Sequence, residues 1–241
     1  MKIRRTFGFT LAEVLITLGI IGVVAAMTMP TLIQNQQKRS LEVATQKFYS
    51  MMSQAVKQYM ADYGVDDLRH TPLASDNYED KASPEAISSI RDFVTKYLKV
   101  VKECDHDAND CFAPEYKGWN GSKTDSNFTI YENMDEFRDY VLADGSVIRI
   151  GYYYLPIDLY VDINGKKGPN RVGYDLWSMS IFYDGSIDEG GLTPECKKDD
   201  NECNPKNSPS EERAYRFEVC QGGNYGGCFG HFLENGFKFD Y

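Results

Sequence analysis

The chain contains a long apolar segment followed at once by a segment whose apolar residues lie on one side. Residues 14–33 carry no charge over 20 positions. As a helix this stretch spans roughly 30 Å, which is the thickness of the hydrocarbon core of a membrane. Three basic residues precede it, Lys2, Arg4 and Arg5, and the positive-inside rule keeps them on the cytoplasmic side. The pattern predicts either a membrane anchor or a secretion signal.

Residues 34–63 continue the helical pattern with a polar character. Apolar residues recur there at intervals of three and four positions, at Leu41, Ala44, Phe48, Met52, Ala55 and Tyr59. This spacing places them on one face of an amphipathic helix. Gly64 is typical of a helix end, and Pro30 is the one strong breaker between the two halves. Together the segments predict a single helix of about 54 residues, roughly 80 Å long.

The rest of the chain mixes one further helical pattern with several strand patterns. Ser83, Pro84 and Glu85 form a helix start, and the apolar face behind them predicts a helix to about Lys102. Alternation predicts strands at 140–143 and 146–150, joined by an Asp144-Gly145 turn, and at 159–163, 177–183 and 214–219. Residues 65–82, 103–127 and 189–212 are predicted loops. A long N-terminal helix packed on an antiparallel sheet is an α+β fold.

Composition excludes several classes of protein. The 241 residues are 42% hydrophobic and 26% charged, which is ordinary for a globular protein. These values exclude a disordered chain, a collagen and a polytopic membrane protein. The net charge is -10, and it is -13 without residues 1–8, which hold three basic residues and no acidic one. Because so acidic a surface repels phosphates, we expect no nucleic acid among the partners.

Six cysteines lie downstream of the apolar segment in three close couples. Their even number behind a hydrophobic leader predicts disulfides formed in an oxidising compartment. Although six cysteines allow many pairings, the spacing favours Cys104–Cys111, Cys196–Cys203 and Cys220–Cys228. Buried free thiols in a cytosolic protein are the alternative. Zinc is not expected, since no CxxC occurs and the histidines, His70, His106 and His231, show no ligand-like spacing.

The start of the apolar segment carries a specific motif. The run Gly8-Phe9-Thr10-Leu11-Ala12-Glu13-Val14-Leu15-Ile16 resembles the class III signal of type IV pilins and pseudopilins. The resemblance implies cleavage by a prepilin peptidase after Gly8, followed by N-methylation of Phe9. It also implies that Glu13, at the fifth mature position, acts in assembly, and that Pro30 corresponds to the usual helix kink of the family. The resemblance extends to about Pro30, and the rest of the chain resembles the family only in layout.

The physical chemistry of Glu13 agrees with this resemblance. A charge inside a membrane segment costs about 2.5–3.5 kcal/mol, and the α-ammonium created by cleavage is also costly in lipid. Pairing the ammonium of one subunit with the carboxylate of its neighbour satisfies both charges and sets the register between the two subunits. Small residues at Gly19, Gly22, Ala25 and Ala26 offer a smooth surface for close helix packing.

The resemblance also implies a domain plan and a set of partners. Residues 1–8 are the leader, 9–33 the transmembrane and filament-core half of the helix, 34–63 its amphipathic half and 64–241 the globular head. The partners are the prepilin peptidase and methylase, other pilin or pseudopilin subunits in a helical filament, and an inner-membrane assembly platform. The subunit crosses the inner (cytoplasmic) membrane once with its head outside the cytoplasm, then enters a periplasmic or extracellular filament.

We expect a minor pilin or pseudopilin of a type IV pilus or a type II secretion-like filament. The head is larger and richer in cysteine than a bulk filament subunit requires. Protein secretion, cell adhesion, DNA uptake and the priming of assembly all remain open as the role of the head.

Three other interpretations of the N-terminus remain open. Val24-Ala25-Ala26 is an acceptable site for ordinary signal peptidase, and cleavage there releases a secreted binding protein or enzyme that begins at Met27. Arg4-Arg5-Thr6-Phe7 resembles a twin-arginine signal. An uncleaved single-span anchor is the third. Cleavage by signal peptidase leaves Glu13 unexplained, and the apolar run behind the two arginines is very hydrophobic for a twin-arginine signal, with no cofactor motif after it.

The head contains one candidate metal site. Asp162, Asn164 and Asp175 lie in a Gly-rich segment between predicted strands and carry the oxygen atoms that calcium prefers. Some pseudopilins bind calcium in a loop of the head, which supports the hypothesis by resemblance. Lys166 and Lys167 oppose a cation there, and a turn built from Asx and Gly chemistry is the alternative. The acidic runs at 105–110 and 197–202 are further calcium candidates.

No catalytic motif stands out. The sequence has no Gly-x-Ser-x-Gly, no P-loop and no Gly-x-Gly-x-x-Gly that opens a helix. Acidic residues are too numerous for any pair of them to point to acid–base catalysis. We therefore expect a structural subunit rather than an enzyme, with no cofactor except calcium in the head.

Overall fold

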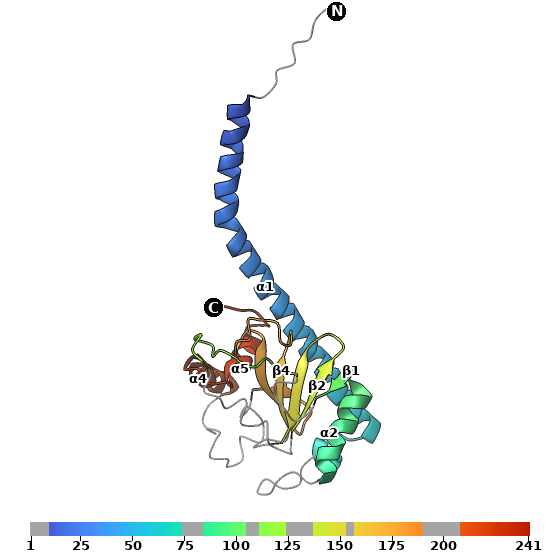
Figure 1. Cartoon of the computed structure of the whole chain (residues 1–241). Helices are drawn as coiled ribbons and strands as arrows, with labels where there is room; N and C mark the ends of the chain where they lie inside the picture. Colours follow the sequence, from blue (N-terminus) through green and yellow to red (C-terminus); the bar gives the residue numbers. More distant parts are fainter. Residues whose placement is uncertain (1–9, 74–83, 105–110, 124–136, 153–156, 190–207) are drawn as a thin grey trace, which may run out of the picture. The chain divides into compact units, whose positions relative to one another are not determined.

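The computed structural model describes residues 10–73, 84–104, 111–123, 137–152, 157–189 and 208–241. The chain divides into two compact units, Met1–Ser40 and Leu41–Tyr241. Helix α1 (Leu11–Tyr63) belongs to both, since it begins in the first unit and ends in the second (Figure 1).

The second unit is an α+β domain. After α1 come the 3₁₀ helix η1 (Leu68–His70), α2 (Pro84–Tyr97), β1 (Val100–Glu103), β2 (Phe137–Leu142), β3 (Val147–Gly151), β4 (Ile157–Asp162), β5 (Leu176–Ile181), β6 (Ile187–Asp188), α4 (Pro209–Gln221) and α5 (Cys228–Glu234). The α+β fold with its long N-terminal helix is therefore confirmed.

The long helix runs unbroken over both predicted halves. It includes Pro30 and ends at Tyr63, where Gly64 takes a positive φ of 67° that favours glycine. Its buried residues in the second unit are Thr45, Phe48, Met52, Ala55, Val56, Tyr59 and Met60. This is the predicted apolar stripe, which packs into the core because it repeats every three to four residues.

The six strands form one sheet in which every neighbouring pair is antiparallel and the order follows the sequence. The β2–β3 hairpin turns at Asp144 and Gly145, as predicted. Gly145 has a φ of 91°, and Oδ1 of Asp144 accepts hydrogen bonds from the amide and hydroxyl of Ser146. The register pairs Val141 with Val147, so the apolar alternation continues across the turn.

Alternation along the strands divides the sheet into an apolar and a more polar face. Ile148, Val161 and Trp177 lie in register on the apolar face. On the other face, Arg149 of β3 contacts both carboxylate oxygens of Asp139 on β2, at 2.8 and 2.7 Å. Both residues are buried, and a buried charge requires such a partner.

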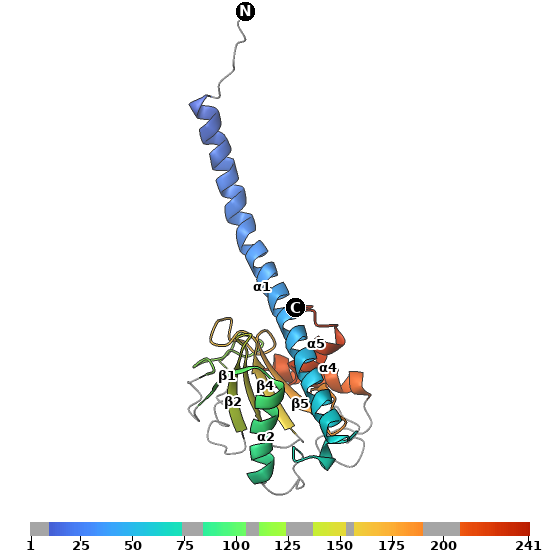
Figure 2. The same ribbon diagram turned by 90° about the vertical axis from the view of Figure 1, so that its right-hand side faces the viewer.

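Helices cover the sheet within the second unit. In Figure 2, α2 and the lower part of α1 lie in front of the strands. The two helices touch through Tyr59 of α1, whose ring lies 5.4 Å from that of Phe93 and 5.6 Å from that of Tyr97. Phe232 of α5 stacks on Trp177 at 4.5 Å. The core therefore joins α1, α2, α5 and the sheet in one cluster.

Three predicted elements need correction. The helix expected to reach Lys102 ends at Tyr97, and Val100–Glu103 forms strand β1 instead. The strand expected at 214–219 is wrong, because these residues lie inside helix α4. The alternation of Tyr215, Phe217 and Val219 resembles a strand pattern. These residues nevertheless form a helix, because a strong helix start precedes them.

That start is a complete capping box. Ser208 accepts from the amide of Glu211, Glu211 accepts from the amide of Ser208, and Pro209 follows the cap. The loop predicted over 189–212 is therefore wrong from Pro209 onward. The segment was also expected to be exposed, and this is wrong at Glu189, which is buried. Residues 190–207 lie outside the described part of the chain.

Candidate functional site

The candidate assembly residue Glu13 lies in the first turn of α1. Its Oε2 accepts hydrogen bonds from both the amide and the hydroxyl of Thr10, each at 2.8 Å. The amide of Glu13 in turn donates to Oγ1 of Thr10 at 3.3 Å. This reciprocal capping box satisfies the carboxylate within its own helix. Thr10 was not predicted to act on Glu13, although the Thr-x-x-Glu pattern signals such a cap.

The apolar half of α1 keeps its few polar side chains satisfied. The hydroxyl of Thr17 donates to the carbonyls of Glu13 and Val14, and that of Thr28 donates to the carbonyl of Val24. Hydroxyls bonded to their own helix expose no unmet donor to an apolar surrounding. The side chains around them are apolar and exposed, from Leu11 at 79% to Val14 at 43%.

Within the described part of the chain, α1 is the helix that is long and apolar enough to cross a membrane. Atoms built at the Cβ positions of Gly19 and Gly22 would meet nothing within 4 Å, so the smooth surface there is open for contact. Pro30 removes one backbone hydrogen bond from the ladder while the helix continues. Gly8 and Phe9, the predicted cleavage and methylation residues, lie outside the described residues.

The three calcium candidates of the head lie together beside β4 and β5. Oδ2 of Asp162 accepts from the hydroxyl of Tyr116, and Oδ1 of Asp162 accepts from the amide of Asn164 at 3.1 Å. The two carboxylate oxygens of Asp175 accept from the amides of Asn170 and Arg171, at 2.7 and 2.6 Å. The alternative interpretation, a turn built from Asx chemistry, thus describes much of this geometry.

The same cluster has features that suit a cation. Asp162 and Asp175 are fully buried, and each carboxylate lies in the electrostatic field of the other. The buried Oδ1 of Asn164 has no hydrogen-bond partner among the described residues. All available ligand atoms are oxygens, as calcium prefers, but no group of three His, Cys, Asp or Glu side chains forms in the described part of the chain.

Burial dominates the titration of this pair. Burial, together with the charge of the nearby Asp175, raises the pKa of Asp162 to about 7, and the hydrogen bond from Tyr116 acts against that rise. Burial also raises the pKa of Asp175 to about 6, against hydrogen bonds from the Arg171 and Asn170 amides. The pair therefore favours a proton, or another positive charge, near neutral pH.

The structure pairs Cys104 with Cys111 and Cys220 with Cys228, two of the three pairs that the spacing predicts. Cys196 and Cys203 lie outside the described residues, as do the acidic runs at 105–110 and 197–202.

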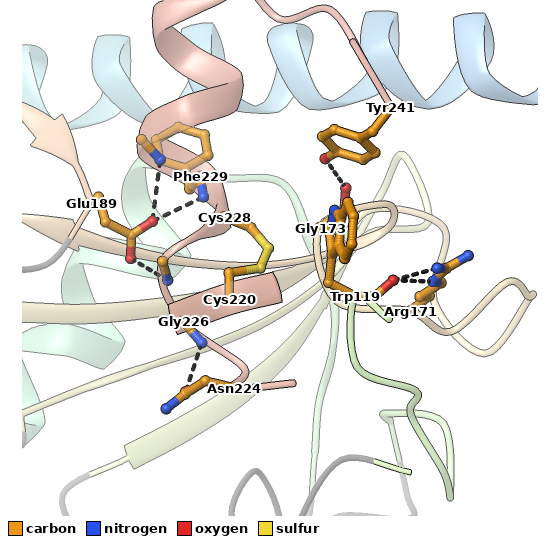
Figure 3. Close-up of a disulfide and its surroundings, with 12 residues drawn as sticks. Trp119, Arg171, Gly173, Glu189, Cys220, Asn224, Gly226, Cys228, Phe229 and Tyr241 are labelled. Carbon is orange, nitrogen blue, oxygen red and sulfur yellow. Dashed lines mark hydrogen bonds between the residues drawn. A yellow bond between two sulfur atoms is a disulfide. The ribbon is translucent and has the colours of Figure 1, made fainter. Parts of the chain in front are cut away.

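A buried carboxylate that the sequence did not predict lies beside the second disulfide. Glu189 accepts from the amides of Gly227, Phe229 and Gly230, at 2.9, 2.8 and 3.1 Å, which fixes the start of α5 (Figure 3). Burial raises the pKa of Glu189, and the three amides act against that shift. The Gly-rich stretch 222–227 is the one sequence signal for such a close approach.

Comparison with protein families gave two matches. A family described as "Family of unknown function (DUF6613)" matches residues 31–182, which is more than half of the chain. A motif described as "Prokaryotic N-terminal methylation motif" matches residues 3–29. This motif is the signal segment of type IV pilins and pseudopilins. Pro30 is the single residue between the two matched ranges. Searches of curated proteins and of solved structures found no match.

Proposed function

Because the chain belongs to the family of unknown function DUF6613 and carries a type IV pilin-type N-terminus, we propose that it is a minor pilin or pseudopilin. It is a pilin-type processed subunit with a membrane-anchoring helix. In this proposal the leader is removed after Gly8, Phe9 becomes the N-methylated first residue, and the subunit enters a type IV pilus or a type II secretion-like filament.

One observation carries the proposal: the N-terminal half of α1 exposes an apolar surface on a helix that starts with a single carboxylate. Its large side chains from Leu11 to Ile33 are exposed. Such a surface needs lipid or other subunits around it, because contiguous apolar patches are unstable in water. A secreted protein cut after Ala26 would lose most of this segment, including Glu13.

In this proposal, the charged groups at the first turn of α1 guide how subunits assemble. Glu13 is held by Thr10 within one subunit. In the filament, the α-ammonium of Phe9 from a neighbouring subunit pairs with this carboxylate, so that neither charge is left alone in an apolar core. A helical filament needs a contact of this heterologous kind, which does not close into a ring.

The proposal assigns no reaction to the chain itself. The methylation motif belongs to structural subunits, and the chemistry belongs to the prepilin peptidase and methylase that act on the chain. The remaining partners are other subunits and the assembly platform of the inner membrane. We propose that the head lies outside the cytoplasm, where the disulfides Cys104–Cys111 and Cys220–Cys228 would form.

The test is the mature N-terminus of the protein purified from its native membrane, read by intact mass and N-terminal sequencing. We expect N-methylated phenylalanine from position 9. The variant Gly8→Val should keep its leader, whereas the matched variant Ala26→Val should be processed normally. A start at Met27, blocked in Ala26→Val, would show ordinary signal cleavage. An uncleaved Met1 would show a plain anchor. Either result overturns the proposal.

We also propose that Asp162, Asn164 and Asp175 hold a calcium ion in the head. Support comes from the two buried carboxylates and from the unpartnered Oδ1 of Asn164. Calcium bound there would tie the segment that joins β4 to β5. This role is structural, and it is independent of the N-terminal processing.

A further inference from the structure

A polar cavity of about 340 Å³ lies beside the second disulfide. It is lined by Ser122, Lys123, Val219, Gly222, Gly223, Asn224 and Tyr225. Four of these residues belong to the loop that Cys220 and Cys228 close, one belongs to α4, and the other two end a short hairpin at 117–123. The volume falls at the lower end of the range of small-molecule sites, which suits one ring-sized ligand.

Both walls of the cavity are fixed before any ligand arrives. The loop wall is held by the disulfide and by Glu189, whose carboxylate binds the amides at its far end (Figure 3). The hairpin wall is held by Asn120, whose Oδ1 accepts from the amide and hydroxyl of Ser122.

The two walls also touch directly. A Cβ on Gly118 would come within 3.1 Å of the Cα of Gly223. Gly223 itself has a φ of 104°, a conformation that favours glycine. Walls fixed in this way do not have to be ordered by a ligand, which reduces the entropy cost of binding.

The charge of the cavity differs from that of the protein. The net charge of the chain is -10, yet none of the seven described lining residues is acidic and one is a lysine. Lys123 lies directly opposite Lys117 in an antiparallel bridge, and Lys117 is bridged in turn to Arg171. Like charges in opposite positions are unfavourable. An anionic group bound in the cavity beside Lys123 would reduce that repulsion.

The remaining lining groups suit a sugar ring. Oδ1 of Asn224 accepts from the amide of Gly226 at 3.1 Å, so its Nδ2 group is left as a donor. The hydroxyl of Ser122 donates to Asn120, so its oxygen is left as an acceptor for a ligand hydroxyl. Tyr225 adds an aromatic ring, and Val219 adds an apolar patch. Hydroxyl partners, a ring surface and a cation recur in sites for small polar ligands.

We propose that this cavity binds an acidic saccharide unit such as a hexuronate, with the carboxylate at Lys123 and the ring against Tyr225. The inference rests on the head alone and does not depend on processing or filament assembly. The loop with the disulfide lies beyond residue 182, outside the range that matches the DUF6613 family. Ser122 and Lys123 lie inside that range, so the cavity combines a matched segment with the disulfide loop beyond it.

The test uses the full chain in lipid nanodiscs and follows ligand signals by saturation-transfer NMR, with empty nanodiscs as background. The probes are sodium glucuronate, glucose as the ring without charge, and acetate as the charge without ring. We expect saturable glucuronate binding at least about tenfold tighter than binding of either control. Lys123→Gln should weaken glucuronate binding about tenfold, which corresponds to one lost ionic contact.

Two further variants separate the cavity from the general surface. Lys57→Gln removes an exposed lysine of α1 and should leave binding unchanged. Val219→Trp fills the cavity without changing its charge and should abolish binding. An unchanged melting temperature of this variant shows that the fold is kept. The proposal is wrong if acetate or glucose binds as tightly as glucuronate, if Lys123→Gln binds like the native chain, or if no glucuronate binds.

Discussion

The ammonium of Lys238 lies 2.9 Å from Oε2 of Glu42, across 196 positions of sequence. The other oxygen of Glu42 accepts from the amide of Phe239, also at 2.9 Å. Glu42 lies on α1 just after the boundary between the two compact units, and its side chain is only 12% exposed. The segment at 238–239 therefore fastens α1 to the second unit near the point where that unit begins.

Glu42→Gln should loosen this attachment. The variant keeps one side-chain oxygen but loses the charge, and its NH2 group would face another donor, either the backbone amide of Phe239 or the ammonium of Lys238. We expect the free energy of unfolding of the second unit to fall by about 1 kcal/mol. Hydrogen exchange should rise first in the helix around Leu41–Tyr49. The control Glu115→Gln, at an exposed position, should change neither quantity.

Glu13→Ala should separate processing from assembly. The peptidase site lies ahead of Glu13, so we expect cleavage after Gly8 to continue largely as before. Incorporation into filaments should be lost, because the neighbouring ammonium no longer finds a carboxylate. The measurement compares the mature N-terminus with the amount of subunit in sheared filaments. The control variant Thr17→Val, one helical turn away, should still assemble. Normal assembly of Glu13→Ala would contradict the proposed role of Glu13 in setting the register between subunits.

The sequence predicted most where a pattern was long. The apolar stripe from Leu41 to Tyr59 repeats often enough to identify one face, so the helix end at Tyr63 was also correct. The Asp144-Gly145 turn was correct because a glycine at positive φ fixes the hairpin locally. The signal at Gly8–Ile16 was identified by its residues, and the methylation motif matches there.

The sequence analysis failed for two reasons: one local signal was given less weight than an alternating pattern, and other features depend on contacts between distant residues. Helix α4 was read as a strand because Tyr215, Phe217 and Val219 alternate, although Ser208 and Glu211 already signal a cap. The burial of Glu189 depends on amides about 40 positions away, which no local pattern shows. The calcium candidates Asp162, Asn164 and Asp175 were chosen for oxygen chemistry alone, so the burial of the two carboxylates was unforeseen.

The stability of the protein should fall as pH rises from acid to neutral. Asp162 and Asp175 have folded-state pKa values of about 7 and about 6, above their ordinary 3.8. Between about pH 4 and pH 7 the folded state therefore binds more protons than the unfolded state, and the slope of stability against pH is negative. Below this window both states are protonated, and above it the cost of two buried charges is complete.

We expect the protein to melt at a higher temperature at pH 5 than at pH 8. Its free energy of unfolding should be about 1–3 kcal/mol larger at pH 5. Circular dichroism on the full chain in detergent without divalent cations gives the measurement. Asp162→Asn should shrink the difference between the two pH values, whatever it does to absolute stability. Asp66→Asn, at an exposed position, should leave the difference unchanged. Because burial also raises the pKa of Glu189, part of the difference should persist in Asp162→Asn.

Calcium should restore the stability that the folded protein loses at high pH. At pH 8 both carboxyls are ionised, so a cation bound by Asp162, Asn164 and Asp175 would replace the missing protons and raise the melting temperature. At pH 5 protons compete for the same oxygens, and the increase should be small. Magnesium, which demands a tighter octahedral shell, should act more weakly. Asp175→Asn should abolish the calcium response at pH 8. A response that survives in Asp175→Asn would place the ion elsewhere in the head, and no response at either pH would contradict the calcium proposal.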